Sequence, residues 1–317
     1  MLHSPPNGFR TDRAFENKLN DKSHRSYKLS FKEVLGVCVI VLALTSVIVP
    51  VFAGIQKSSS TSANLKQLAT AIIAYSEDYS GTFPIAIARS ATTGQWWWNN
   101  RVAVPAGWPP SFDQDRSERD RWVWVNSTKP YYQDSAVLTI QGLPKFRSLA
   151  DAEYDNARYP WENVSVTFNG LLHTYPMSSV SEPSKQTLIW TGMGLVQHEG
   201  FTVSNPTLIC NQTNQPCRYQ PASSGCGLSL NGSTGQLFSP YATVWLAGRS
   251  AIFVSIDTAV RIIPLGAVVG DQPPDGQPFT DWRYDPYTGY NAQGRPGFYW
   301  VDGCHPWLFR PDFDFAN

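Results

Sequence analysis

The chain has 317 residues and carries 25 Lys or Arg against 25 Asp or Glu, so its formal net charge is zero. Because charged residues make up only 16% of the chain, the basic surface typical of nucleic-acid binding is excluded. Hydrophobic residues make up 42%, and 24 prolines and 23 glycines indicate many turns. This composition predicts one or two domains rich in strands and loops.

An apolar segment near the N-terminus determines the predicted topology. Residues 34–55 form a run of 22 residues without a charge, VLGVCVIVLALTSVIVPVFAGI. As a helix with a rise of about 1.5 Å per residue, this run reaches roughly 30 Å, the hydrocarbon thickness of a bilayer. Basic residues are concentrated before the run, which predicts a cytoplasmic N-terminus and an exported remainder.

Two interpretations of this segment are open. Val51 and Ala53, three and one residues before Gly54, fit a signal-peptidase site, which would make the run a cleaved signal peptide. The apolar pattern continues, however, in Leu65, Leu68 and Ile72 at three- and four-residue steps, which predicts one helix to about residue 79. We therefore favour a membrane anchor whose helix continues into the exported part.

Residues 29–84 resemble the N-terminus of type IV pilin-like proteins, in particular the large bacterial group with a C-terminal processing-associated domain. The match includes Asn-Leu-Lys-Gln-Leu at 64–68 and Asp-Tyr-Ser-Gly-Thr-Phe-Pro at 78–84. The resemblance implies a pilin-like α+β fold with loop-rich insertions. In such a fold a long N-terminal helix, membrane-spanning in its front half, is packed against an antiparallel β-sheet.

The resemblance also implies assembly roles for three residues. With Pro50 at the proline position of the family helix, Leu29 is the first mature residue and Glu33 is the fifth. In pilins a carboxylate at that position pairs with the free α-amine of a neighbouring subunit, and Pro50 would kink the helix. Prepilin peptidase would cut between Lys28 and Leu29, where the family has Gly and Phe. The alternative is an uncut tail, with Glu33 in the headgroup zone beside Lys32.

The predicted domain organisation follows this helix. Residues 1–28 are a cytoplasmic leader or tail, 29–55 the transmembrane helix, 56–80 its exported continuation, and 81–317 an exported β-rich domain with an irregular C-terminal arm. The chain is thus expected to cross the inner membrane once, with its C-terminal domain in the periplasm or at the cell surface. Short apolar runs predict strands at 136–140, 164–168, 187–190, 242–246, 251–256 and 261–263. The last two runs predict a hairpin.

The five cysteines are unevenly distributed. Cys38 lies in the apolar run, whereas the other four lie in the C-terminal half and allow three disulfide connectivities. We favour the pairs Cys210–Cys217 and Cys226–Cys304, and four free thiols are the open alternative. A zinc site is disfavoured because the spacing lacks Cys-x2-Cys pairs.

A cluster of tryptophans is the most unusual local motif. Trp96, Trp97 and Trp98 are followed by two asparagines at 99–100. Exposed aromatic rings stack on sugar rings, and the amides would bond sugar hydroxyls, so this motif is a candidate ligand-stacking site. The alternative is that the rings form part of a core or a subunit contact, because tryptophan is enriched in both.

Acidic residues recur in a loop rich in glycine and proline. Asp271, Asp275, Asp281 and Asp285 would supply oxygen ligands to Ca²⁺. The residue order of an EF-hand is missing, so a solvated loop is the default interpretation, and we predict no metal site.

Catalytic motifs are missing from the sequence, which has no Gly-x-Ser-x-Gly elbow, no His-Glu-x-x-His and no phosphate loop. We therefore predict no enzymatic activity and no cofactor. The predicted function is that of a pilin-like or pseudopilin-like structural subunit of a type IV pilus or type II secretion-type assembly. Its partners would be the inner membrane and like or related subunits. The alternative is a membrane-tethered exported binding protein, with glycans as the candidate ligand, that does not polymerise.

Overall fold

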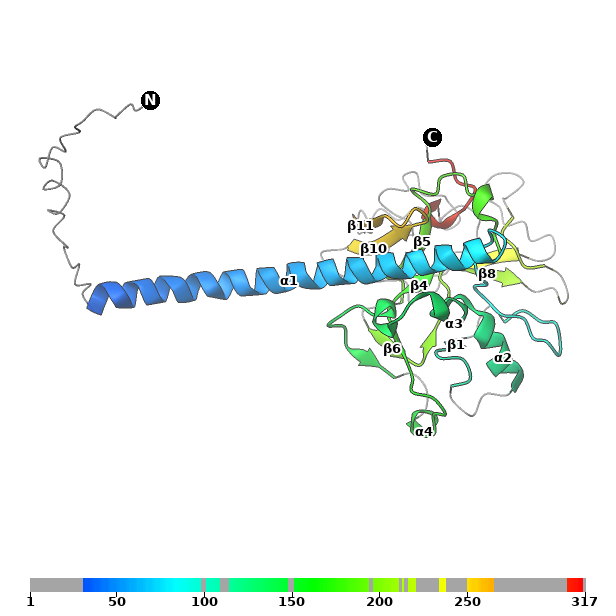
Figure 1. The fold of residues 1–317 in the computed structure, drawn as a ribbon, viewed down its shortest axis with the longest axis horizontal. Helices are drawn as coiled ribbons and strands as arrows, with labels where there is room; N and C mark the ends of the chain where they lie inside the picture. Colours follow the sequence, from blue (N-terminus) through cyan, green and yellow to red (C-terminus); the bar gives the residue numbers. More distant parts are fainter. Residues whose placement is uncertain are drawn as a thin grey trace, which may run out of the picture. The chain divides into compact units, whose positions relative to one another are not determined.

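The computed structural model describes residues 31–97, 101–108, 114–147, 151–193, 196–210, 213, 216–220, 234–237, 250–264 and 307–315. The chain divides into two compact units, Met1–Gly54 and Ile55–Asn317. Helix α1 (Phe31–Asp78) begins in the first unit and ends in the second. All strands and the other helices of the described residues belong to the second unit (Figure 1).

The described residues do not support a membrane-spanning helix. No helix among them is long and apolar enough to cross a membrane. A span needs about 20 consecutive apolar residues, and the described side chains in the first part of α1 are those between Lys32 and Ile40. The predicted fold, with a membrane-spanning front half of the helix, is therefore wrong as stated. The coarser α+β class agrees with the mixture of helices and strands.

A four-stranded antiparallel sheet forms the centre of the second unit. Its strands are β4 (Thr167–Phe168), β5 (Thr187–Trp190), β10 (Ser250–Ser255) and β11 (Val260–Pro264), in the order β11-β10-β5-β4. The predicted hairpin is confirmed, because β10 and β11 pair antiparallel. Ser250 is opposite Pro264 at one end of the pair, and Val254 is opposite Val260 at the other. The strand predicted at 187–190 is confirmed as β5, and the one predicted at 242–246 lies outside the described residues.

The other elements of the second unit are short. They are β1 (Val102–Ala103), α2 (Gln114–Trp122), α3 (Trp124–Ser127), η2 (Lys129–Tyr131), η3 (Ser135–Leu138), β2 (Lys145–Phe146), α4 (Asp151–Asp155), β3 (Asn163–Val164), η4 (Gly170–Leu172), η5 (Met177–Ser179), β6 (Gln197–Glu199), β7 (Phe201–Thr202), β8 (Thr207–Cys210), β9 (Thr234–Leu237) and η7 (Trp307–Phe309). The strand predicted at 136–140 is wrong, because most of this run forms the 3₁₀ helix η3. The side chain of Asp134 caps η3 by accepting the N–H of Ala136, which favours the helical turn over an extended strand.

Helix α1 ends in a left-handed turn. Ser80 has φ of 61°, and the N–H of Gly81 donates to the carbonyl of Ser76 at 2.9 Å. This is the hydrogen bond of a Schellman motif, which provides a donor for a carbonyl that has no partner within the helix. Phe83 then enters the core and its N–H donates to the carbonyl of Tyr175, so the chain after the helix is tied back to the domain.

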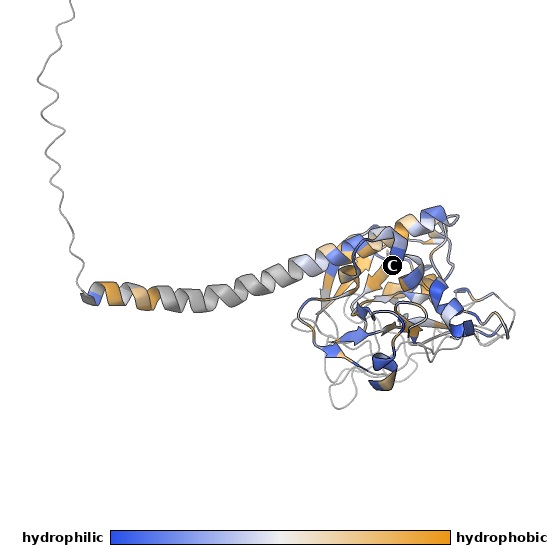
Figure 2. Cartoon of the chain, turned by 60° about the horizontal axis from the view of Figure 1, so that its bottom comes forward, coloured by the Kyte–Doolittle hydropathy of each residue, from blue (hydrophilic) through white to orange (hydrophobic). Residues whose placement is uncertain are grey.

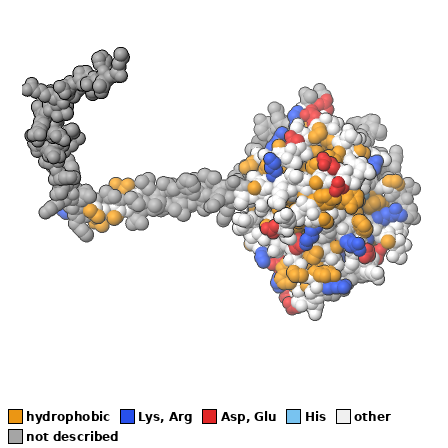
Figure 3. All heavy atoms as spheres, viewed as in Figure 1, with side chains coloured by type: hydrophobic (Ala, Val, Ile, Leu, Met, Phe, Trp, Pro, Cys, Tyr) orange, Lys and Arg blue, Asp and Glu red, His pale blue; other side chains and the backbone are white. Residues whose placement is uncertain are grey.

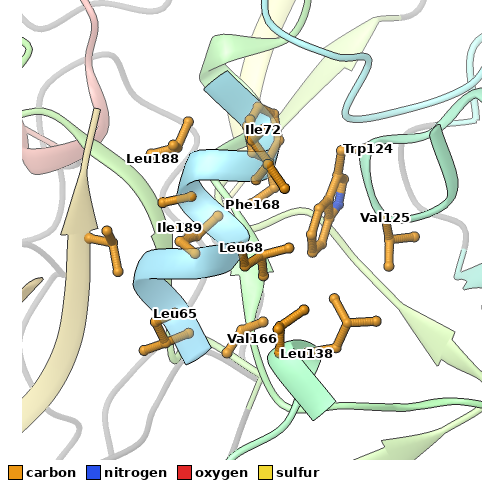
Figure 4. Packing of buried hydrophobic residues seen from close by; sticks show 14 of the residues in the cluster. Leu65, Leu68, Ile72, Trp124, Val125, Leu138, Val166, Phe168, Leu188 and Ile189 are labelled. Atoms are coloured by element: carbon orange, nitrogen blue, oxygen red, sulfur yellow. The ribbon is translucent and has the colours of Figure 1, made fainter. Parts of the chain in front are cut away.

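The second part of α1 packs on one face of the central sheet. Leu65, Leu68 and Ile72 are fully buried in one cluster with Leu188 and Ile189 of β5. Figure 4 shows these helix side chains among Leu188, Ile189 and apolar side chains from other segments of the unit. The apolar stripe predicted from the sequence thus forms a core, because residues three and four apart share one face of a helix.

The other face of the sheet is covered by a second apolar cluster. Along β10 the side chains alternate, so that Phe253 lies in this cluster while its neighbours Ile252 and Val254 lie in the helix-facing one. The Phe253 ring stacks on Trp190 with centroids 5.4 Å apart, and Phe309 packs on Trp190 at 5.0 Å. The described part of the C-terminal arm therefore packs onto the sheet.

Short paired strands surround this centre. Besides the central sheet, β1 pairs with β7, β8 pairs with β9, and β6 lies between β2 and β3. Gly200, between β6 and β7, has φ of +78°, and a Cβ there would lie 1.9 Å from the Trp108 ring. Figure 2 shows hydrophobic residues gathered in the interior of this unit and hydrophilic ones at its periphery.

Candidate functional site

The start of α1 presents apolar side chains to solvent. Val34, Leu35, Val39 and Ile40 are between 45% and 60% exposed, and apolar side chains of the first unit are visible in Figure 3. Water is an unfavourable environment for such a row, since each fully buried aliphatic side chain gains about 1.5–3 kcal/mol. A contiguous exposed apolar surface typically marks an interaction site.

The predicted assembly residues are only partly within the described region. Lys28 and Leu29, the predicted processing site, lie outside the described residues. Glu33 and Pro50 lie within α1, and their side chains are outside the described ones. The structure thus places Glu33 in the first turn of the helix, one residue before the exposed apolar row begins at Val34.

The predicted disulfide between Cys210 and Cys217 is present. The two Cα atoms are 5.8 Å apart and both residues are buried in the cluster that covers the outer face of the sheet. Cys38 is a free, exposed cysteine in α1. Cys226 and Cys304 lie outside the described residues, so their predicted pairing stays a prediction.

Trp96 and Trp97 pack against other residues of the second unit. The Trp96 ring meets the His173 ring edge-on at 5.2 Å, and the Arg119 guanidinium lies 4.5 Å from the Trp97 ring centroid. Both tryptophans are half-buried. The two rings therefore take part in intramolecular packing, and Trp98 lies outside the described residues, as do the asparagines that follow it.

His173 is the most strongly perturbed histidine of the described chain. Its Nδ1 accepts the N–H of Ala86 at 2.9 Å and the N–H of Ile87 at 3.4 Å, so the neutral ring carries its proton on Nε2. Burial, with a smaller contribution from the charge of Arg218, lowers the pKa of His173 from 6.5 to about 3. The ring is thus a neutral acceptor that fixes the segment following α1, and no acid–base role is assigned to it.

A pocket of about 570 Å³ lies elsewhere on the second unit. It is lined by Pro105, Ala106, Lys129, Ser135, Tyr159, Pro160, Trp161 and Glu162. The residues come from three separate segments of the chain, and an ion pair between Lys129 and Glu162 joins two of them. The volume is within the range of about 300–1,000 Å³ that is usual for small-ligand sites.

This pocket was not predicted from the sequence. The one local signal was the triplet Tyr159-Pro160-Trp161, in which a proline holds two aromatic residues in an extended segment. Nothing in the spacing of Lys129 and Glu162, 33 residues apart, indicates that they meet. The four aspartates proposed for Ca²⁺, from Asp271 to Asp285, lie outside the described residues.

Comparisons with known proteins assign no family to the chain. No family model matches it. No curated protein and no solved structure matches it either. On the face shown in Figure 3, described acidic and basic side chains are interspersed, which indicates no surface of a single charge there.

Proposed function

We propose that this protein is a pilin-like structural subunit that assembles with like or related subunits through the start of helix α1. The observation that supports the proposal best is the row of exposed apolar side chains at Val34, Leu35, Val39 and Ile40. These side chains follow directly on Glu33, the carboxylate that the pilin resemblance assigns to subunit pairing. The predicted inner-membrane location and cytoplasmic tail stay predictions.

The exposed row suits helix-to-helix assembly for a physical reason. Leu35 and Val39 are four residues apart and share one face of the helix, and Val34 and Ile40 extend the apolar surface to either side of them. Copies of this helix would therefore bury apolar area against one another. A carboxylate beside such an interface is costly to bury unless it is paired. The pairing of Glu33 with the α-amine of a neighbour would satisfy that requirement and fix one register.

Self-association of the full chain tests this function. The Val39→Asp variant places a charge in the exposed row, and Gln67→Asp is the matched control because Gln67 is an exposed residue later in the same helix. We expect light scattering after size exclusion in mild detergent to give multimers for the wild type and Gln67→Asp, and monomers for Val39→Asp. A wild type that stays monomeric at all concentrations contradicts the proposal.

A second experiment examines the role of Glu33. We expect Glu33→Gln to weaken self-association, whereas Glu77→Gln, at an exposed position near the end of the same helix, leaves it unchanged. Intact-mass analysis of the native protein shows whether the chain starts at Leu29, which the amine pairing requires. If the monomeric chain instead floats with phospholipid vesicles, lipid covers the apolar row and assembly is not its role.

A further inference from the structure

The pocket between residues 105–106, 129–135 and 159–162 has the features of a ligand site that is independent of helix assembly. All its lining residues belong to the second unit, and it combines aromatic and proline side chains with one ion pair and a serine. Ligand sites typically join a mostly apolar wall with a few placed polar groups. The chemistry of the aromatic wall and of the polar groups indicates the class of ligand.

The aromatic wall is held rigidly. The Trp161 ring packs on Tyr154 with centroids 5.9 Å apart and on Trp108 at 6.0 Å, and the Arg147 guanidinium lies 5.3 Å from its centroid. Arg147 itself is fixed by Glu199, whose Oε2 accepts its Nε–H at 2.7 Å. A wall that is already ordered loses little side-chain entropy when a ligand binds.

Tyr159 is the exposed member of the wall. It is 43% exposed, although the Arg158 guanidinium lies 5.4 Å from its ring centroid. Pro160 follows it and restricts the backbone between the two aromatic residues. An exposed ring beside two prolines offers a flat apolar surface to a ligand that also has an apolar face.

The polar groups carry no net charge. Lys129 pairs with Glu162, so the one cation and the one anion among the lining residues compensate each other. The Oε2 atom of Glu162 is buried and has no hydrogen-bond partner among the described residues. An acceptor in this state favours a donor such as a hydroxyl, and a charged ligand would have to compete with the ion pair.

We propose that this pocket binds a neutral sugar unit. A pyranose ring presents an apolar C–H face that packs on aromatic rings, and its hydroxyl edge both donates and accepts hydrogen bonds. The face matches Tyr159 and Trp161, and the hydroxyls match Glu162, Lys129 and Ser135. The site differs from the tryptophan motif at 96–98, so glycan binding does not depend on that motif.

Glycan-array binding of the labelled full chain tests the proposal. The array carries neutral oligosaccharides of glucose and N-acetylglucosamine together with sialylated and sulfated glycans. We expect the chain to bind neutral glycans, Tyr159→Ala to bind them about tenfold more weakly, and Tyr159→Phe to bind like the wild type because it keeps the ring. Trp122→Ala is the matched control, since Trp122 is 54% exposed on α2 and does not line the pocket.

Each result decides the question. Circular dichroism of Tyr159→Ala confirms that the variant is folded, as its exposure predicts. Absence of binding to every glycan on the array overturns the proposal, as does a preference for acidic glycans. A Tyr159→Ala variant that binds like the wild type overturns it too, and so does a loss in Trp122→Ala as large as the loss in Tyr159→Ala.

Discussion

The two ends of helix α1 contain similar aliphatic side chains in opposite environments. In the second unit Leu65, Leu68 and Ile72 are fully buried against a sheet of the same chain. In the first unit Val39 and Ile40 are about 60% exposed. Because the side chains are of the same chemical type, the difference lies in what the chain provides to cover them.

This difference separates stability from function. The buried stripe stabilises the second unit, since removing apolar area from water is the main favourable contribution to folding. The row is exposed among the described residues, and in the proposed function it contacts other subunits. Substitutions in the stripe should therefore change the free energy of unfolding of the second unit, and substitutions in the row should change the self-association of the chain.

Truncation in the buried stripe has the largest expected effect. We expect Leu68→Ala to lower the free energy of unfolding of the second unit by about 3 kcal/mol, because it leaves a cavity in a fully buried cluster. Val39→Ala is the control, and it should leave the urea midpoint unchanged. Equal destabilisation by both variants would show that the exposed row is also covered within the chain, which contradicts the comparison.

Acid weakens the segment that follows the buried stripe. The pKa of His173 is about 3 in the folded state and 6.5 in the unfolded state, so the unfolded state takes up the proton first. The contribution of neutral His173 is complete above pH 6.5 and is lost as the pH falls toward 3. Between pH 6.5 and 4.5 the loss amounts to about 2–3 kcal/mol.

The variant His173→Gln isolates this effect. It cannot take up a proton in this range, so its free energy of unfolding should change less with pH than that of the wild type between pH 6.5 and 4.5. Burial also lowers the pKa of His198, which adds to the acid sensitivity of both proteins and cancels in their difference. Parallel pH profiles for the two proteins would mean that His173 is solvated or protonated when folded.

Loss of the disulfide should have a slightly smaller effect. The double variant Cys210→Ala, Cys217→Ala opens a short loop with a sequence separation of 7, and the chain-entropy model gives a loss of about 2 kcal/mol. The control is Cys38→Ser, which changes a free, exposed cysteine in the first unit. We expect the double variant alone to lower the urea midpoint. A midpoint that does not respond would place the loop outside the cooperative unit.

How much of this could be predicted from the sequence depends on how local each pattern is. The stripe at Leu65, Leu68 and Ile72 follows from the helix period of about 3.6 residues, and strands β10 and β11 follow from the strand period of about 2 residues. Each of these patterns is visible within a single helix or strand. The two-residue strands are too short to show any period. The pocket joins Lys129 to Glu162 across 33 residues, and only tertiary packing brings such positions together.

The fold prediction was wrong in its membrane-spanning helix. Membrane spanning was inferred from the apolar run at 34–55, and no helix of the described residues meets the requirement for a span. The tryptophan motif was ambiguous for a different reason. A cluster of tryptophan rings has the same sequence pattern whether it binds a ligand or packs in a core. The contacts of Trp96 with His173 and of Trp97 with Arg119 exist only in the folded chain.

The smallest expected effect concerns the hairpin that covers the buried stripe. Thr258 has φ of 65° in the turn between β10 and β11, a conformation that costs a residue with a Cβ about 1–2 kcal/mol. Thr258→Gly removes that cost but gives the unfolded chain more freedom, so we expect a net gain below about 1 kcal/mol. Thr258→Ala is the control, because it keeps the Cβ and should give no gain.

The gain should appear in one unit only. Ile252 and Val254 of β10 lie in the cluster that buries the helix stripe, so a firmer hairpin raises the urea midpoint of the second unit. Self-association through the first unit should be the same in Thr258→Gly and in the wild type, since the substitution lies in the second unit and the exposed row in the first. If the variant changes association as well as unfolding, the exposed row depends on the sheet and the two ends of α1 do not act separately.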